Sequence, residues 1–298
     1  MVTVVTETAV PRLTVPTRLL VLGMAHEDGT VHAAEVFPVA AACGQGAEQV
    51  RSCFRRLVGE GLFTRHGVGQ DARYEATAAG VAAMGSTMER HRLAYAQDAA
   101  GRGWDRHWHL AAFAVPEANR AARDGLRDRL LELGGAAVHN GLYLSPHRWE
   151  KDVRGDAERL GIEAHVTLAS TDDLEIGGIS DPRDLTRHLW PIDDLATGYQ
   201  RFVEAFRDVP ASLDGMRRRH ERLPDAAFLP GAFAMAVAFQ RCFERDPLLP
   251  PELLPRPWPG RAARELLVKS RRLAVRMREA HGKPALFRGF DDLIESIP

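Results

Sequence analysis

Three arginines lie close together in the stretch QGAEQVRSCFRRL, residues 45–57. At about 100° per residue, a helix here gathers Val50, Phe54 and Leu57 on one side. The other side is polar and carries Glu48, Gln49, Ser52, Arg55 and Arg56, with Arg51 at the margin. Arginine can pair with guanine through two hydrogen bonds, and glutamine can pair with adenine in the same way. The pattern fits either a solvated helix face or a surface that reads DNA bases.

A second group of arginines follows this helix. Residues 62–77, LFTRHGVGQDARYEAT, alternate around Gly67, Gly69 and Asp71, which predicts a β-hairpin. We expect Arg65 and Arg73 in this hairpin, together with Arg51, to contact phosphates, which position a protein without specifying sequence. The alternative is that Arg51 or Arg56 pairs with an acid such as Glu48 or Glu60. Residues 45–73 hold five arginines and three acids, a small surplus that favours a dimer with doubled phosphate contacts.

These residues belong to an N-terminal segment, residues 1–95. Its pattern predicts a helix over 18–27, a brief strand over 30–32, a helix over 33–43, the arginine-rich helix, the hairpin and a further helix after Thr77. Pro38 predicts a late start or a kink in the second helix. This order is typical of a winged helix-turn-helix, in which the third helix enters the major groove and the wing lies along the backbone.

The rest of the chain predicts an α+β fold with two further domains. Residues 96–179 alternate strands and helices, with strands expected in HWHLAAFAV, HNGLYLSP and EAHVTLAS, which predicts a ferredoxin-like sheet with helices packed on it. Residues 180–298 are helical and interrupted by proline, with RDPLLPPELLPRPWPG expected to be a rigid connector.

Composition excludes several classes. The chain has 39 basic and 40 acidic residues among 298, so its bulk charge indicates no partner. Its three cysteines, Cys43, Cys53 and Cys242, have no CxxC spacing, which suits a reducing cytosol. The start of the sequence has no signal-peptide pattern. The most apolar segment, residues 226–239, is shorter than the roughly 20 residues of a membrane helix, so we expect a buried core helix and a cytoplasmic protein.

Metal and catalytic signals are weak. His107 and His109 lie on one face of a predicted strand, and His147 could join them as a third ligand of Zn²⁺. Two histidines without a spaced third ligand favour packing or hydrogen bonding, so we expect no metal. The sequence contains no GxSxG, no GxGxxG after a strand and no P-loop. We therefore expect no cofactor and no enzymatic activity.

Four motifs resemble the PaaX-type family of bacterial transcriptional repressors of phenylacetate catabolism. VRSCFRRLVGEGLF, residues 50–63, resembles the family's recognition helix and the start of its wing. WHLAAFAVPEANRAARDGLRDRLLELGG and then GLYLSP, residues 108–135 and 141–146, resemble its central domain. RDPLLPPELLPRPWPGRAA, residues 245–263, resembles its C-terminal signature and is the most specific of the four. Gly46 departs from the family, which more often has a side-chain helix cap there.

The resemblance implies a homodimeric repressor that binds a palindromic operator in double-stranded DNA and is released by an acyl-CoA thioester such as phenylacetyl-CoA. Such a ligand needs cations for its phosphates and flat apolar surfaces for its adenine and acyl group. The candidate effector residues are Trp104, Trp108, Arg148, Trp149, Arg187 and Trp190. The alternative is that these tryptophans are ordinary core and interface residues.

Two other classes of protein remain open. The central segment also resembles the Cas2 group of ferredoxin-like nucleases, which place a metal-binding aspartate at the end of the first strand. Ala114 stands at that position, and alanine cannot bind Mg²⁺, so the nuclease interpretation lacks its key ligand. The other class is a protein-interaction module whose DNA-binding segment no longer binds DNA.

Overall fold

The computed structural model of the chain describes residues 15–221, 225–281 and 286–297. The described residues divide into two compact units. One unit draws on Met1–Arg92, Tyr199–Phe243 and Arg261–Pro298, and the other on Leu93–Gly198 and Glu244–Gly260. The last helices of the chain therefore belong to the same unit as the N-terminal segment.

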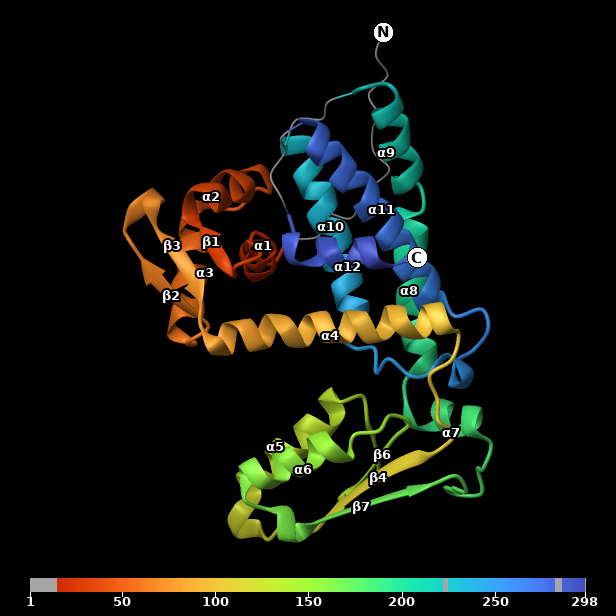
Figure 1. The fold of residues 1–298 in the computed structure, drawn as a ribbon. Coiled ribbons are helices and arrows are strands. Elements are labelled where there is room, and N and C mark those ends of the chain that lie inside the picture. Colours follow the sequence, from red (N-terminus) through yellow and green to blue (C-terminus); the bar gives the residue numbers. More distant parts are fainter. Residues whose placement is uncertain (1–14, 222–224, 282–285, 298) are drawn as a thin grey trace. The chain divides into compact units, whose positions relative to one another are not determined.

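The N-terminal part of the first unit has a small sheet and four α-helices, the last of which ends in the second unit (Figure 1). Its elements are α1 (Thr17–Gly23), β1 (Thr30–His32), α2 (Ala33–Ala42), α3 (Ala47–Gly59), β2 (Phe63–His66), β3 (Arg73–Ala76) and α4 (Ala78–Ala100). The sheet is antiparallel with strand order β1-β3-β2. The elements follow the order expected from the sequence. Pro38 does not delay α2, which begins at Ala33. Pro38 cannot donate to the carbonyl of Ala34, but Ala34 is exposed, so water can satisfy that carbonyl.

The core beneath α3 explains why its apolar side is hidden. Val50, Phe54 and Leu57 are buried, and the ring of Phe54 stacks on that of Tyr74 from β3, with centroids 3.9 Å apart. The C-terminal helix α10 (Asp225–Phe243) packs against α2 and adds Phe233 to this core. A segment from the far end of the chain therefore completes the N-terminal core.

The remaining helices of this unit are α8 (Ile192–Phe206, which begins in the second unit), α9 (Val209–Arg218), α11 (Pro259–His281) and α12 (Asp291–Ser296). The expectation of a core helix over 226–239 is confirmed for the side chains that the structure describes, since Leu229, Phe233 and Val237 of α10 are buried. Among the described helices, none is both long enough and apolar enough to span a membrane.

The second unit is built on a four-stranded antiparallel sheet with strand order β5-β6-β4-β7. Its elements are β4 (Trp108–Phe113), α5 (Arg120–Glu132), β5 (Ala136–His139), β6 (Leu142–Ser145), α6 (Glu150–Leu160), β7 (Val166–Thr171) and α7 (Pro182–Leu189). Helices α5 and α6 lie on one face of the sheet (Figure 1). This is the ferredoxin-like arrangement expected for the central segment.

Two details of this unit differ from expectation. The stretch around residues 139–146 is not one strand but a hairpin of β5 and β6, which turns at Gly141 with φ of 77°. A Cβ at Gly141 would lie 2.6 Å from the carbonyl oxygen of Phe113, so only glycine fits this turn. The proline-rich connector packs on the unit rather than only bridging it, because Leu249 and Leu253 are buried in one cluster with Trp108.

Candidate nucleic-acid interface

The polar side of α3 faces away from the core. Gln49, Arg51, Arg55 and Arg56 are exposed, and Ser52 is half-buried. The packed side chains of Val50, Cys53, Phe54 and Leu57 hold the opposite side of the helix in place. Within its own unit, α3 therefore presents a row of polar side chains outward.

One carboxylate, that of Glu48, joins two of these arginines. Its Oε2 accepts a hydrogen bond from Nε of Arg51 at 2.9 Å, and its Oε1 accepts one from Arg55 at 2.8 Å. The hydrogen bonds from Arg55 and Arg51 hold the pKa of Glu48 below its ordinary value. The structure therefore shows the alternative for Arg51, in which it pairs with an acid of its own chain, and Arg55 pairs with the same carboxylate. All three side chains are more than half exposed, so phosphates can compete for the two guanidinium groups.

Gln49 has a local role that sequence reasoning did not anticipate. Gly46, which precedes α3, has no side chain to cap the helix, and its own N–H donates to Oε1 of Gln49 at 2.8 Å. Two-point pairing with adenine needs both the oxygen and the nitrogen of the amide. Gln49 can read a base in that way only after it leaves Gly46.

The other acid near α3 pairs elsewhere. Oε2 of Glu60 accepts a hydrogen bond from Arg18 of α1 at 2.6 Å. In the hairpin, Arg65 and Arg73 are both exposed, and Arg73 lies 3.4 Å from Glu75 of the same strand. The structure thus brings the seven candidate DNA-binding residues onto α3 and the adjacent hairpin, with three of their guanidinium groups paired to carboxylates.

The six candidate effector residues do not form one group. Trp108 and Trp190 stack with ring centroids 6.4 Å apart, and Trp104 lies beside Trp108 at 5.4 Å. Trp149 belongs to a different cluster, where its ring packs so closely on Gly135 that a Cβ there would lie 2.4 Å away. Trp108, Trp149 and Trp190 are at most 5% exposed, which gives all three a role as core side chains.

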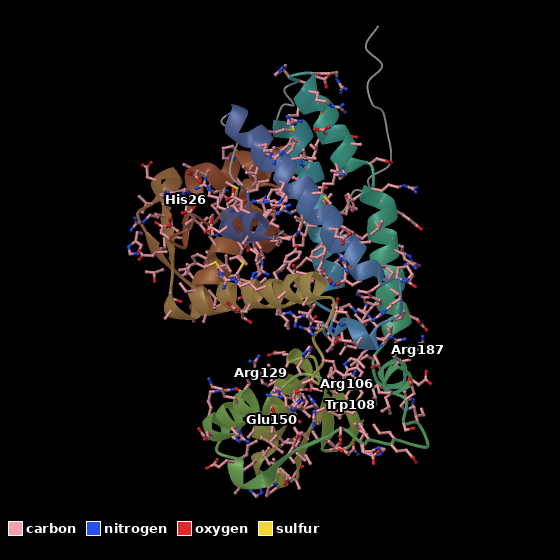
Figure 2. All side chains as sticks on the ribbon, turned by 45° about the vertical axis from the view of Figure 1, so that its right-hand side comes forward. His26, Arg106, Trp108, Arg129, Glu150 and Arg187 are labelled. Carbon is pink, nitrogen blue, oxygen red and sulfur yellow. The ribbon has the colours of Figure 1, made fainter. Side chains whose placement is uncertain are left out.

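The two arginines of this set lie outside those clusters. Arg187 is on α7, where it pairs with Asp184 at 3.3 Å, and Trp108 is on β4 (Figure 2). Arg148 is exposed, and its Nε donates to Asp105 at 2.7 Å. A role for either arginine in ligand binding stays a prediction.

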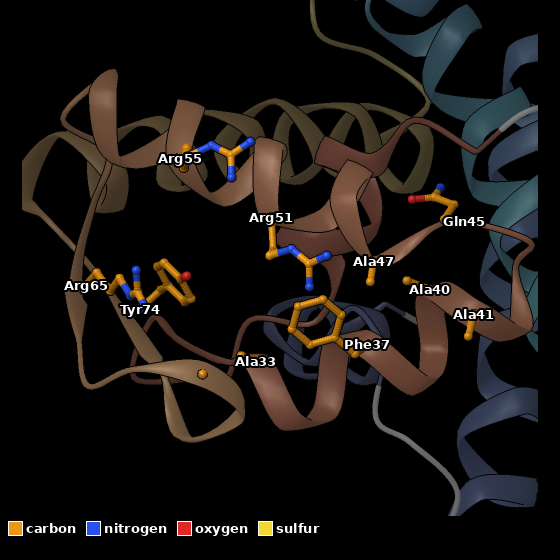
Figure 3. A pocket seen from close by; sticks show the side chains of 11 residues that line it. Ala33, Phe37, Ala40, Ala41, Gln45, Ala47, Arg51, Arg55, Arg65 and Tyr74 are labelled. Carbon is orange, nitrogen blue, oxygen red and sulfur yellow. The ribbon is translucent and has the colours of Figure 1, made fainter.

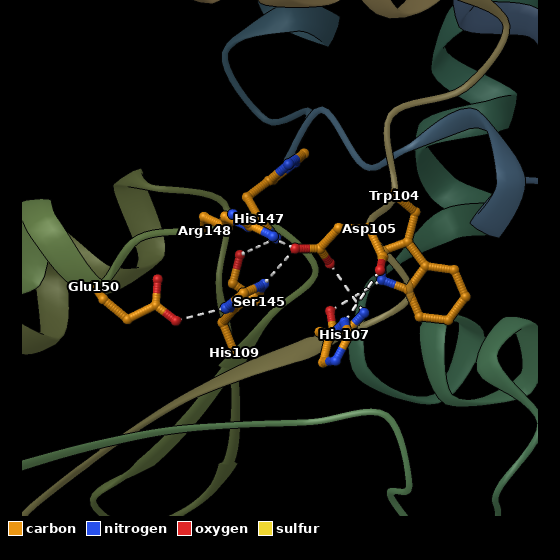
Figure 4. A network of polar contacts seen from close by, with 8 residues as sticks. All are labelled: Trp104, Asp105, His107, His109, Ser145, His147, Arg148 and Glu150. Carbon is orange, nitrogen blue, oxygen red and sulfur yellow. Dashed lines mark hydrogen bonds and ion pairs between the residues drawn. The ribbon is translucent and has the colours of Figure 1, made fainter.

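A polar network that the sequence did not reveal surrounds His109 (Figure 4). Its ring is buried, with Nδ1 2.5 Å from Oε1 of Glu150 and Nε2 3.3 Å from Oδ2 of Asp105. Partial burial raises the pKa of Glu150, but the hydrogen bond from His109, a backbone hydrogen bond and the nearby charges of His109 and Arg154 together outweigh it and leave the pKa below its ordinary value. Partial burial likewise raises the pKa of Asp105, and hydrogen bonds from Arg148 and the His107 N–H bring it below normal.

The histidines considered for zinc take hydrogen bonds instead. Nε2 of His147 donates to the carbonyl oxygen of Leu248 at 2.9 Å, and burial lowers the pKa of the His147 ring. Over the part of the chain that the structure describes, no three His, Cys, Asp or Glu side chains are grouped to hold a metal ion. Ala114 follows β4 and is exposed.

Comparison with known proteins identifies the class. The family described as PaaX protein central Cas2-like domain matches residues 101–185, and the PaaX-like protein C-terminal domain matches residues 190–283. Together these matches cover more than half of the chain, which belongs to the PaaX-type family, so the resemblance inferred from its motifs is confirmed.

Among particular proteins, the chain is similar to the Transcriptional repressor PaaX of Escherichia coli (strain K12). The two are 24% identical over 252 residues, which are 82% of this chain and 74% of the relative. In fold it is similar to the uncharacterized protein Rv0674 from Mycobacterium tuberculosis, with a TM-score of 0.52 and 22% sequence identity over 84% of this chain and 91% of that one.

Proposed function

We propose that this protein is a cytoplasmic, homodimeric DNA-binding repressor and not an enzyme. In this proposal residues 1–95 form a winged helix-turn-helix, with α3 in the major groove and the β2–β3 hairpin along the backbone. The observation that carries it is the outward row of Gln49, Arg51, Ser52, Arg55 and Arg56 above a packed apolar side. The similarity to a transcriptional repressor supports the same function.

The side chains of α3 and the hairpin are assigned to base edges or to phosphates according to their position. Ser52, Arg55 and Arg56 lie on the outermost side of α3 and are assigned to base edges, with Gln49 joining them when it leaves Gly46. Arg51, Arg65 and Arg73 are assigned to phosphates. A homodimer would place two such surfaces on the halves of a palindromic operator.

The effector in this proposal is an acyl-CoA thioester, of which phenylacetyl-CoA is the example that the family suggests. It would be bound by the central and C-terminal domains, residues 96–179 and 180–298, and would change the spacing of the two α3 helices. Arg148, Arg187 and Trp104, which are not fully buried, are the members of the candidate set best able to meet a ligand. The buried tryptophans would then support the site from beneath.

The enzyme alternative has one specific observation against it. Ala114 occupies the place at which a ferredoxin-like nuclease carries its metal-binding aspartate, and alanine offers no ligand. Without that ligand, the central sheet serves as a dimerisation or ligand platform.

A gel-shift assay with the DNA upstream of the protein's own gene tests the function. We expect binding that weakens steeply as salt rises and is much weaker in Arg55→Ala. Arg92→Ala is the matched control, because Arg92 is also an exposed helical arginine paired with a glutamate, at a position on α4 outside the proposed interface. Metal-dependent cleavage of that DNA would instead support the enzyme, and no binding at low salt would support the interaction module.

The effector is tested by repeating the assay with a panel of CoA thioesters. Release of the DNA by one thioester, and not by free CoA, is the expected result. If no thioester in the panel weakens DNA binding, the effector part of the proposal fails while the DNA-binding part stands.

A further inference from the structure

A hollow of about 570 Å³ opens between α2, α3 and the hairpin (Figure 3). All of its lining residues lie between Ala33 and Tyr74, so it is formed within one unit of the protein. Its volume is in the range of about 300–1,000 Å³ that is typical of small-molecule sites.

The hollow has an apolar wall of fixed geometry. Ala33, Phe37 and Ala40 of α2 form one side, and Tyr74 lies opposite on β3. The Tyr74 ring cannot easily move, since it stacks on Phe54 with an interplanar angle of 5° and is only 7% exposed. A flat apolar group is the shape that fits between such side chains.

Three guanidinium groups line the same hollow. Arg51 and Arg55 come from α3, and Arg65 comes from β2, where it lies opposite Tyr74 in the strand register. Arg51 and Arg55 share the carboxylate of Glu48, whereas Arg65 takes part in none of the ion pairs found among the described residues. Planar guanidinium groups bind carboxylates and phosphates through paired, charge-assisted hydrogen bonds.

We propose that this hollow binds a small organic anion, a flat apolar body that carries a carboxylate or a phosphate, and that the bound anion excludes DNA. The apolar body lies between Phe37 and Tyr74, and the charged group lies at Arg65 and the two arginines of α3. Because Arg51 and Arg55 line the hollow and also belong to the proposed DNA surface, one anion cannot hold them while phosphates and bases do. Only this second half of the inference rests on the proposed function.

The binding half is tested without DNA. Isothermal titration of the full-length protein with 2-naphthoate and 2-naphthyl phosphate is compared with titration by the neutral 2-naphthol, which has the same apolar body. We expect saturable binding of at least one of the two anions at one site per chain, and binding at least about tenfold weaker for the neutral compound. Comparison of the two anions distinguishes a carboxylate site from a phosphate site.

Two variants locate the site. Arg65→Ala removes the unpaired cation and is expected to weaken anion binding by about tenfold. Ala41→Leu adds bulk from the exposed end of α2 into the hollow and is expected to have the same effect, whereas Ala34→Leu, at an exposed α2 position outside the hollow, is expected to have none. Melting temperatures measured alongside show whether each variant is folded. Anion binding that is unchanged in folded Arg65→Ala and Ala41→Leu overturns the proposal.

The competition half uses fluorescence anisotropy with labelled operator DNA. The anion is expected to displace DNA from the native protein and from Ala34→Leu, at concentrations that match its own dissociation constant. If anion and DNA bind together without mutual effect, the exclusion is refuted although the site stands. If DNA does not bind at all, the proposed function fails, and the titration without DNA still decides whether the hollow is an anion site.

Discussion

Glu48→Gln tests whether Arg51 and Arg55 of α3 bind DNA or only pair with a carboxylate of their own chain. In the free protein one exposed carboxylate holds the guanidinium groups of Arg51 and Arg55, at 2.9 and 2.8 Å. Glutamine keeps the size of the side chain but removes its negative charge. If Arg51 takes a phosphate and Arg55 a base edge in the complex, removal of the carboxylate that competes for both strengthens DNA binding.

The size of the effect follows from counting charges. Residues 45–73 carry five arginines and three acids, and the substitution removes one of those acids from each chain. A dimer gains two positive charges at its DNA surface, which steepens the slope of log K against log salt by about 1.8. When salt falls from about 200 to about 50 mM, the affinity of the variant therefore rises about 12-fold more than that of the native protein.

Fluorescence anisotropy over a series of salt concentrations measures this slope with operator DNA and with scrambled DNA. We expect a similar change of slope on both, because the slope reports the charge that meets phosphates, which carry no sequence information. The control is Glu89→Gln, since Glu89 pairs with Arg92 three residues along α4 as Glu48 pairs with Arg51 three residues along α3. A slope that stays at the native value, or weaker binding at low salt, would refute the reasoning.

Three further predictions concern specificity and stability. Arg56→Ala is expected to weaken operator binding by about 1–3 kcal/mol and to change binding of scrambled DNA much less, as measured by competition titration; an equal loss on both would make Arg56 a phosphate contact. Gly80→Ala brings a Cβ to 2.1 Å from the carbonyl oxygen of Leu62 and is expected to cost about 1–3 kcal/mol in urea unfolding, while Gly85→Ala, with open space around it, is expected to gain about 0.5–1 kcal/mol; similar effects at both positions would contradict the close approach of Gly80 to Leu62. Burial lowers the pKa of His91 from 6.5 to about 4, so its neutral ring contributes stability that is complete above pH 6.5 and is lost as pH falls toward 4. From pH 7 to 5 the native protein loses about 2 kcal/mol of stability through His91. The side chain of His91→Gln cannot be protonated in this range, so the variant is expected to lose about 2 kcal/mol less than the native protein over the same change of pH.

The fold features that the sequence predicted well are those set by local pattern. The apolar spacing of Val50, Phe54 and Leu57 predicts both the helix and the side that packs, because period and burial are linked in a helix. The central sheet was predicted from its longer strands. Strand β5 was missed because Ala136–His139 has small side chains and no alternating pattern of its own, and is held by pairing with β6.

The site details depend on contacts that no local pattern contains. Glu48 precedes Arg51 by three residues and Arg55 by seven, which allows either ion pair in a helix. That the one carboxylate pairs with both arginines depends on side-chain rotamers in the folded helix. The buried position of Trp149 follows from the missing side chain of Gly135, which comes from another element. Likewise, the packing of α10 on α2 joins residues that are about two hundred positions apart.

Methylation protection is the most direct test of the central claim that the outward side of α3 reads the major groove. Dimethyl sulfate attacks N7 of guanine in that groove, which is where Arg55 or Arg56 would bind. We predict protected guanines in two patches about 10–10.5 base pairs apart, or a multiple of that spacing, and loss of one protected guanine from each patch in Arg55→Ala. Guanines that stay equally reactive with and without bound protein, or a pattern that Arg55→Ala leaves unchanged, would contradict it.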